Sequence, residues 1–156
     1  MTEDRAPAVE HGGDGPGVIL VGLDASQIDR PGAQSSMHAA AYATGLARRQ
    51  GARLLAVWVR PSVAYSDTMA VTADAIGRQR REAAAEAHDT VEWAAGHYGI
   101  PKASLVIREG DPFEELTRVA EDVRADAIVV GSSAQRLGSL AVRLVKDARW
   151  PVTVVP

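Results

Sequence analysis

"ADAIVVGSSAQRLGSL", residues 125–140, decides the fold of this chain. Its apolar run at 127–130 is short and closed by Gly131, a pattern typical of a buried strand. Gly138 and Ser139 then precede a segment whose apolar residues recur with helical spacing. A buried strand, a loop bounded by glycines and a helix form the unit that repeats in α/β proteins, and many such proteins hold phosphate in that loop.

Four other short apolar runs extend this pattern along the chain. Several are almost continuously apolar rather than alternating, which indicates strands covered on both faces of a parallel sheet. We therefore expect an α/β fold, a doubly wound, Rossmann-like sheet with helices on both faces. The expected strands are 18–23, 53–59, 104–108, 127–131 and 152–156. The expected helices are 36–50, 77–98, one that begins at Pro112, and roughly 139–149.

The third helix has the clearest start signal. Asp111 is a candidate N-cap, Pro112 suits the first turn, and Glu114 stands three residues after the cap. Ser139 is the candidate cap of the fourth helix. Helical spacing predicts four buried stripes: Ala39, Ala43, Leu46 and Ala47; Ala84, Ala87, Val91, Ala94 and Tyr98; Leu116, Val119, Ala120 and Val123; Ala141, Leu144, Val145 and Ala148.

Composition narrows the function classes. The chain has 156 residues, a net charge of −3 and no cysteine. This charge gives no reason to expect nucleic acid or a membrane as partner, and the polar N-terminus has neither a basic n-region nor an apolar h-region. We expect a disordered tail over 1–16, one domain over 17–156 and a cytoplasmic location.

Two segments, 25–36 and 60–77, are longer than the connections of such a fold require. Both follow strands at the edge where open α/β sheets bind ligands. They are either tolerated insertions or elements that engage a protein or a small molecule.

An assembled catalytic site is not evident. Ser132 and Ser133 follow a strand and a glycine, but the Gly-x-Ser-x-Gly pattern of hydrolases is absent. The four histidines at 11, 38, 88 and 97 show no metal-ligand spacing, so we expect no metal site. We expect a binding protein rather than an enzyme.

Five pieces of the sequence, in the right order and spacing, resemble the universal stress protein family over roughly residues 17–156. They are "VILVGLDAS", "GARLLAVWV", "REGDP", "ADAIVVGS" and "PVTVVP". The resemblance implies a five-stranded sheet of order 3-2-1-4-5 and a stress-related binding or regulatory module. It also implies a pocket for an adenine nucleotide, with slow ATPase activity at most.

The resemblance also implies particular site residues. Asp24 matches an Asp that reads the adenine or ribose region, and Val59 matches the position whose backbone meets the base. Gly131 and Gly138-Ser139 match the ends of the phosphate loop. The candidate nucleotide-binding residues are Asp24, Ala25, Ser26, Val59, Gly131, Ser132, Arg136, Gly138, Ser139 and Leu140.

The phosphate loop departs from the family's pattern. Ala134 stands where the pattern has its second glycine, and the six residues between Gly131 and Gly138 are half of its length. A loop this short cannot surround a triphosphate, so we expect a degenerate pocket with weak or no ATP binding. Arg136 and the helix that starts at Ser139 would still attract a monophosphate, a cyclic nucleotide or a smaller anion. The alternatives are a true ATP, AMP or cyclic-nucleotide binder, and a module whose two long loops bind a partner.

The last strand, 152–156, predicts an assembly. It is short and apolar, and at the edge of a sheet it would leave backbone groups unpaired. In the family this strand often pairs with its twofold mate, which implies a homodimer. The candidate interface residues are Trp150, Val152, Thr153, Val154 and Val155.

Overall fold

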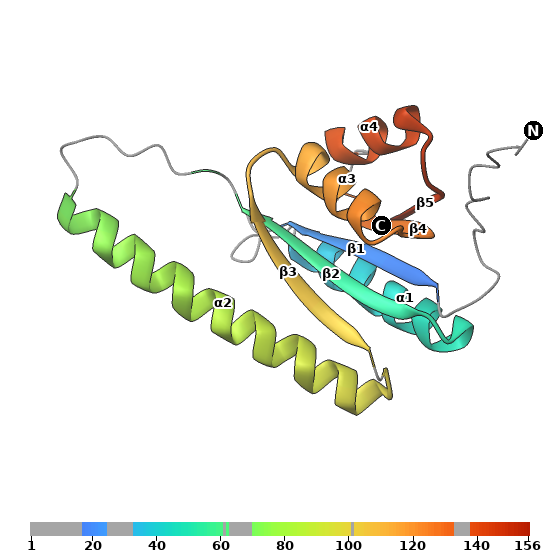
Figure 1. Cartoon of the computed structure of the whole chain (residues 1–156), viewed down its shortest axis with the longest axis horizontal. Coiled ribbons are helices and arrows are strands. Elements are labelled where there is room, and N and C mark those ends of the chain that lie inside the picture. Colours follow the sequence, from blue (N-terminus) through green and yellow to red (C-terminus); the bar gives the residue numbers. More distant parts are fainter. Residues whose placement is uncertain (1–16, 25–32, 61, 63–69, 101, 133–137) are drawn as a thin grey trace, which may run out of the picture.

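The computed structural model of this chain describes residues 17–24, 33–60, 62, 70–100, 102–132 and 138–156. Strands and helices alternate along these residues (Figure 1). They are β1 (Val18–Asp24), α1 (Ala33–Gln50), β2 (Arg53–Arg60), α2 (Ala70–Tyr98), β3 (Ala103–Glu109), α3 (Pro112–Asp122), β4 (Ala127–Gly131), α4 (Ser139–Asp147) and β5 (Val152–Val155).

The five strands form one parallel sheet in the order β3-β2-β1-β4-β5, which confirms the predicted topology. β1 lies at the centre, where Gly22 pairs with Val57 of β2 on one side and Val130 of β4 on the other. Since β2 follows β1 in one direction across the sheet and β4 in the other, the strand order reverses at β1. Figure 1 shows α3 and α4 together above the sheet and α1 on the opposite side.

Each face of the sheet has its own apolar core, because successive strand residues point to opposite faces. On the α3 and α4 face, Val57, Leu116 and Leu144 are fully buried. On the α1 and α2 face, Ala43 and Trp58 are buried in a second cluster. The near-continuous apolar strands therefore serve two cores at once, as their pattern predicted.

The predicted buried stripes are confirmed for α1 and α3, but not at the ends of α2 and α4. Tyr98, the last residue of α2, is 45% exposed, and Val145 is 51% exposed. Ala148 is exposed as well, because α4 ends at Asp147 and the chain then turns through a left-handed conformation at Ala148 (φ 55°). The predicted stripes therefore continue past the last residues that these two helices bury.

The predicted start of the second helix was wrong. α2 begins at Ala70 instead of residue 77, so residues 70–77 of the predicted loop are helical. Gly77 was taken as a boundary, yet it lies inside the helix, where glycine costs only about 1 kcal/mol relative to alanine. α1 also starts three residues before its predicted start at 36. The other parts of the two long loops, 25–32 and 63–69, lie outside the described residues, as does the predicted tail over 1–16.

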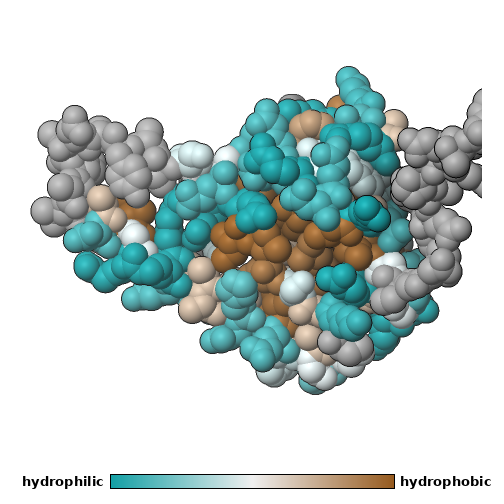
Figure 2. Space-filling model, viewed as in Figure 1, coloured by the Kyte–Doolittle hydropathy of each residue, from teal (hydrophilic) through white to brown (hydrophobic). Residues whose placement is uncertain are grey.

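The surface has an apolar region. In Figure 2, hydrophobic side chains gather over the strands between α2 and α3, with hydrophilic side chains around them. In Figure 1, α2 runs past the sheet at its N-terminal end.

Within the described ranges, no helix has the length and hydropathy that a membrane crossing requires.

Candidate functional site

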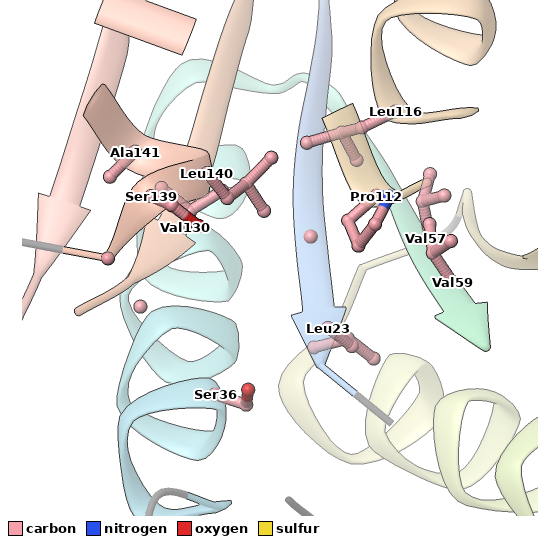
Figure 3. Close-up of a pocket in the computed structure, with 13 residues that line it drawn as sticks. Leu23, Ser36, Val57, Val59, Pro112, Leu116, Val130, Ser139, Leu140 and Ala141 are labelled. Carbon is pink, nitrogen blue, oxygen red and sulfur yellow. The ribbon is translucent and has the colours of Figure 1, made fainter. Parts of the chain in front are cut away.

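A cavity of about 320 Å³ opens where β1 and β4 end. This is the place where the strand order reverses and where open α/β sheets bind their ligands. Helix α1 leaves β1 toward one face of the sheet and α4 leaves β4 toward the other, so the two strand ends separate. Figure 3 shows the cavity between the end of β1, the start of α4 and the residues of β2 and α3 that line it.

Five of the predicted ligand residues line this cavity together. They are Val59, Gly131, Gly138, Ser139 and Leu140. Asp24 is the last residue of β1 and pairs with Val59, so its backbone lies at the same edge of the sheet. Three other predicted residues, Ala25, Ser26 and Arg136, lie outside the described residues.

The backbone N–H of Ser132, another of the candidate ligand residues, is bound within the sheet. It donates to the carbonyl oxygen of Val155 at 2.7 Å. This hydrogen bond continues the pairing of β4 with β5 beyond Gly131. The Ser132 amide is therefore occupied by the sheet and is not available to a ligand.

At the wall formed by α4, three backbone N–H groups have no acceptor within the helix. Gly138 is the N-cap and its position carries no side-chain hydrogen bond to the helix, so the expectation that Ser139 is the cap was wrong. The first hydrogen bond of the helix runs from the N–H of Val142 to the Gly138 carbonyl oxygen at 3.2 Å. The amides of Ser139, Leu140 and Ala141 consequently have no acceptor within α4, and all three residues line the cavity. Together with the helix dipole, they favour an anion at this end.

The rest of the lining is apolar or small. Leu23, Val57, Pro112 and Leu116 are among the apolar residues, and Figure 3 shows them around the cavity. None of the described lining residues is titratable, and the only side-chain hydroxyls among them are those of Ser36 and Ser139. The described part of the site can bind a ligand through shape, backbone donors and hydroxyl groups.

Gly22 keeps the floor of the cavity open. A Cβ atom at this position would lie 3.3 Å from Val130 Cγ1 and 3.4 Å from both methyl carbons of Leu116. Only glycine lets β1 approach α3 this closely without moving a neighbour. Sequence reasoning missed Gly22 as a site residue, although a glycine inside an apolar strand was a signal of close approach.

Arg143 of α4 is already paired with the carboxylate of Asp111. The Asp111 carboxylate accepts from the N–H of Glu114 at 3.0 Å and from Arg143 at 3.1 Å to each of its oxygens. The hydrogen bond from the Glu114 N–H and the Arg143 guanidinium hold the pKa of Asp111 below its ordinary value. Arg143 also lies over the Phe113 ring, 4.3 Å from its centroid. Asp111 is thus the predicted N-cap of α3, and Arg143 is held away from a ligand role.

A parallel five-stranded sheet of this order, with a cavity where the strand order reverses, defines a doubly wound α/β protein. The profile of the universal stress protein family matches residues 17–156. The chain therefore belongs to the universal stress protein family.

Known relatives agree with this assignment. A universal stress protein of Methanocaldococcus jannaschii is 31% identical over 138 residues, which cover 82% of this chain and 79% of that protein. A solved family member from Burkholderia pseudomallei is 29% identical, with a TM-score of 0.65 over 89% of this chain and 95% of that one. UspA from Lactobacillus plantarum has a TM-score of 0.71 at 22% identity, over 92% of this chain and 100% of its own.

Some solved relatives contain nucleotides. A universal stress protein from Archaeoglobus fulgidus was solved in complex with dAMP (22% identity, TM-score 0.59, over 90% of this chain and 98% of that one). A family protein from Arabidopsis thaliana was solved with AMP bound (21% identity, TM-score 0.63, over 90% of each chain). A further universal stress protein was solved in complex with cAMP (20% identity, TM-score 0.57, over 90% of this chain and 96% of that one). At these identities the likeness to this chain is one of fold.

Proposed function

We propose that this chain is a stress-response binding module that takes adenosine monophosphates, linear or cyclic, in the cavity at the β1 and β4 ends. ATP binds there weakly. The observation that carries this proposal is that three α4 amides without an acceptor within the helix meet an apolar floor where the strand order reverses. The bound dAMP, AMP and cAMP of the three relatives support it.

The adenosine end fits the apolar part of the cavity. Val59 and Pro112 offer apolar surface to a base, and the backbone of Asp24 lies beside that of Val59 at the strand ends. The cavity, about 320 Å³, lies at the lower end of the usual range for small-molecule sites, which starts near 300 Å³. The role of Asp24 as the residue that reads the base or ribose is part of the proposal.

The phosphate end fits one phosphate. The available donors are the amides of Ser139, Leu140 and Ala141 and the Ser139 hydroxyl, with no cationic side chain among the described lining residues. Only six residues join Gly131 to Gly138. At about 1.5–3 kcal/mol for each charge-assisted hydrogen bond, the loss of two bonds to the outer phosphates lowers affinity about a hundredfold or more.

We expect the module to bind its nucleotide with slow turnover at most. Chemistry at a phosphate needs a general base or an electrophile placed at the reacting atoms. The described lining residues supply hydroxyls and amides alone.

Calorimetry with AMP, cAMP and ATP, each with magnesium, tests the proposal. We expect AMP or cAMP to bind at least tenfold more tightly than ATP. Ser139→Tyr places a ring at the phosphate end and should abolish binding, whereas Ser104→Tyr, on the exposed surface of β3, should leave it unchanged. Tighter binding of ATP would contradict the loop argument. Absence of binding of any nucleotide would overturn the proposal. It would favour the alternative of a module whose two long loops bind a partner.

We also propose that the chain forms a homodimer through β5. β5 lies at the edge of the sheet, and within the described residues only β4 pairs with it. Its four residues are only half-buried, and none carries a charge. Trp150, which precedes the strand, is half-buried beneath the Arg149 guanidinium, 4.6 Å from the ring centroid. A second copy of the strand would satisfy the free edge.

A further inference from the structure

A second cavity, of about 370 Å³, lies on the other face of the sheet, between α1 and α2. Trp58 of β2 and Leu105 of β3 line it from the sheet, Met37 from α1, and Ala87 and Val91 from α2. We propose that this cavity is a second ligand site, which takes an amine with an apolar body. The proposal does not depend on nucleotide binding at the first cavity, the one at the β1 and β4 ends.

The apolar part of the second cavity follows from the sequence of α2. The helix packs toward the sheet with Ala83, Ala87 and Val91, and two of these three side chains are single methyl groups. Side chains normally fill a protein interior closely, so these short ones leave room between the helix and Trp58. Met37 is 69% exposed, and its flexible side chain can move to admit a ligand. The apolar body of a ligand gains free energy by burial in this space.

The charge at this cavity is negative. Glu86 of α2 is the only charged residue among the described ones that line it, and it is exposed. None of the ion pairs among the described residues includes Glu86. The other polar side chains of the lining, Ser36 and Thr90, are uncharged hydroxyls. A cationic head group at the edge of the cavity therefore meets a carboxylate that no described cation neutralises, whereas an anionic head group is repelled.

The surface next to this edge also suits a cation. Glu86 and Thr90 line a shallow hollow on α2 as well, together with Asp89 and Trp93. The four residues are three or four positions apart in order, so they form one strip along the helix. Trp93 is 63% exposed and stacks on His97, with the ring centroids 4.8 Å apart. An ammonium group that leaves the cavity past Glu86 thus reaches a second carboxylate and the face of an indole ring, which attracts cations.

Calorimetric titration of the purified protein with octylamine, octanol and octanoate tests the head group. The three probes share an apolar chain and differ in the charge at one end, where octylamine is an ammonium ion at neutral pH. We expect octylamine to bind more tightly than octanol by about fivefold or more, and octanoate to bind most weakly. Glu86→Gln removes the charge and keeps the length of the side chain, so it should remove most of the preference for octylamine. Glu92→Gln, at an exposed residue of α2 that lines neither the cavity nor the hollow, should preserve it.

Ala87→Leu tests the apolar end of the site. It adds bulk from α2 into the cavity and should weaken octylamine and octanol alike by about fivefold or more. Because Ala87 does not line the first cavity, such a loss assigns the probes to the second one. Ala85→Leu, at an exposed position of α2 outside the cavity, should change neither affinity. The proposal is overturned if octylamine does not bind the wild-type protein, or binds Glu86→Gln or Ala87→Leu as tightly. Equal losses in the two control variants would overturn it as well.

Discussion

At the start of α3, the Asp111 carboxylate caps the helix and pairs with Arg143 of α4. Asp111→Ala removes both interactions, and we expect a loss of about 1 kcal/mol in the free energy of unfolding at neutral pH. Most of this loss belongs to the cap, because the ion pair is exposed and contributes little. Chemical denaturation of the two proteins measures the difference.

The same carboxylate makes the difference depend on pH. Its pKa in the folded protein is below the ordinary value of 3.8, so its stabilising effect is complete above that pH. The effect disappears as the pH falls through the folded pKa. The gap between wild type and Asp111→Ala should therefore narrow in acid. Asp122→Ala, at the C-terminal end of the same helix, should not destabilise at neutral pH, since a negative charge there opposes the helix dipole.

Ala148 is a residue whose backbone conformation suits glycine better. Its φ of 55° places it in the left-handed region, where an L-residue costs about 1 kcal/mol. We expect Ala148→Gly to raise the thermal unfolding temperature. Ala85→Gly, at an exposed position inside α2, should lower it by a comparable amount, since glycine there loses helix propensity. Equal effects of the two changes would contradict the conformational argument.

Among the elements, β5 is one of the two edge strands, and within the described residues it is paired only with β4. The carbonyl oxygens of Pro151 and Val155 accept hydrogen bonds from residues of β4 and its end. Because backbone groups alternate sides along a strand, the N–H of Val154 points away from β4, toward the free edge. Val154→Pro removes this donor while the pairing with β4 remains.

Sedimentation analysis tests the role of this edge. We expect a dimer for the wild-type protein and a monomer for Val154→Pro, with unchanged circular dichroism. Val154→Ala keeps the backbone donor and should remain dimeric. A monomeric wild type, or a dimeric proline variant, would show that the edge of β5 is not the interface.

Elements also show what a sequence can and cannot predict. The strands followed from continuous apolar runs, which depend on local composition. Their order followed from the resemblance to the family, because local composition does not determine how strands are arranged in a sheet. The start of α3 was predicted as well, since Asp111 and Pro112 signal it in sequence. The start of α2 was not, because the helix continues through Gly77, and a cost of about 1 kcal/mol for an internal glycine does not by itself end a helix.

At the scale of the whole molecule, the site residues that the sequence predicted lie at the ends of strands or at the start of a helix. Val59, Gly131 and Ser139 are of this kind, and they line the first cavity as expected. Leu116 and Pro112 reach the same cavity from α3, and their contribution depends on how close that helix comes to Gly22.

Leu23 and Ser36 line the cavity at the β1 and β4 ends and also a cavity of about 370 Å³ on the other face of the sheet, between α1 and α2. Figure 3 shows Leu23 at the end of β1. We expect a ligand that fixes this shared wall from one side to change the free energy of binding on the other side. Thermodynamic linkage would make that coupling reciprocal, so that each of two ligands alters the affinity for the other by the same factor.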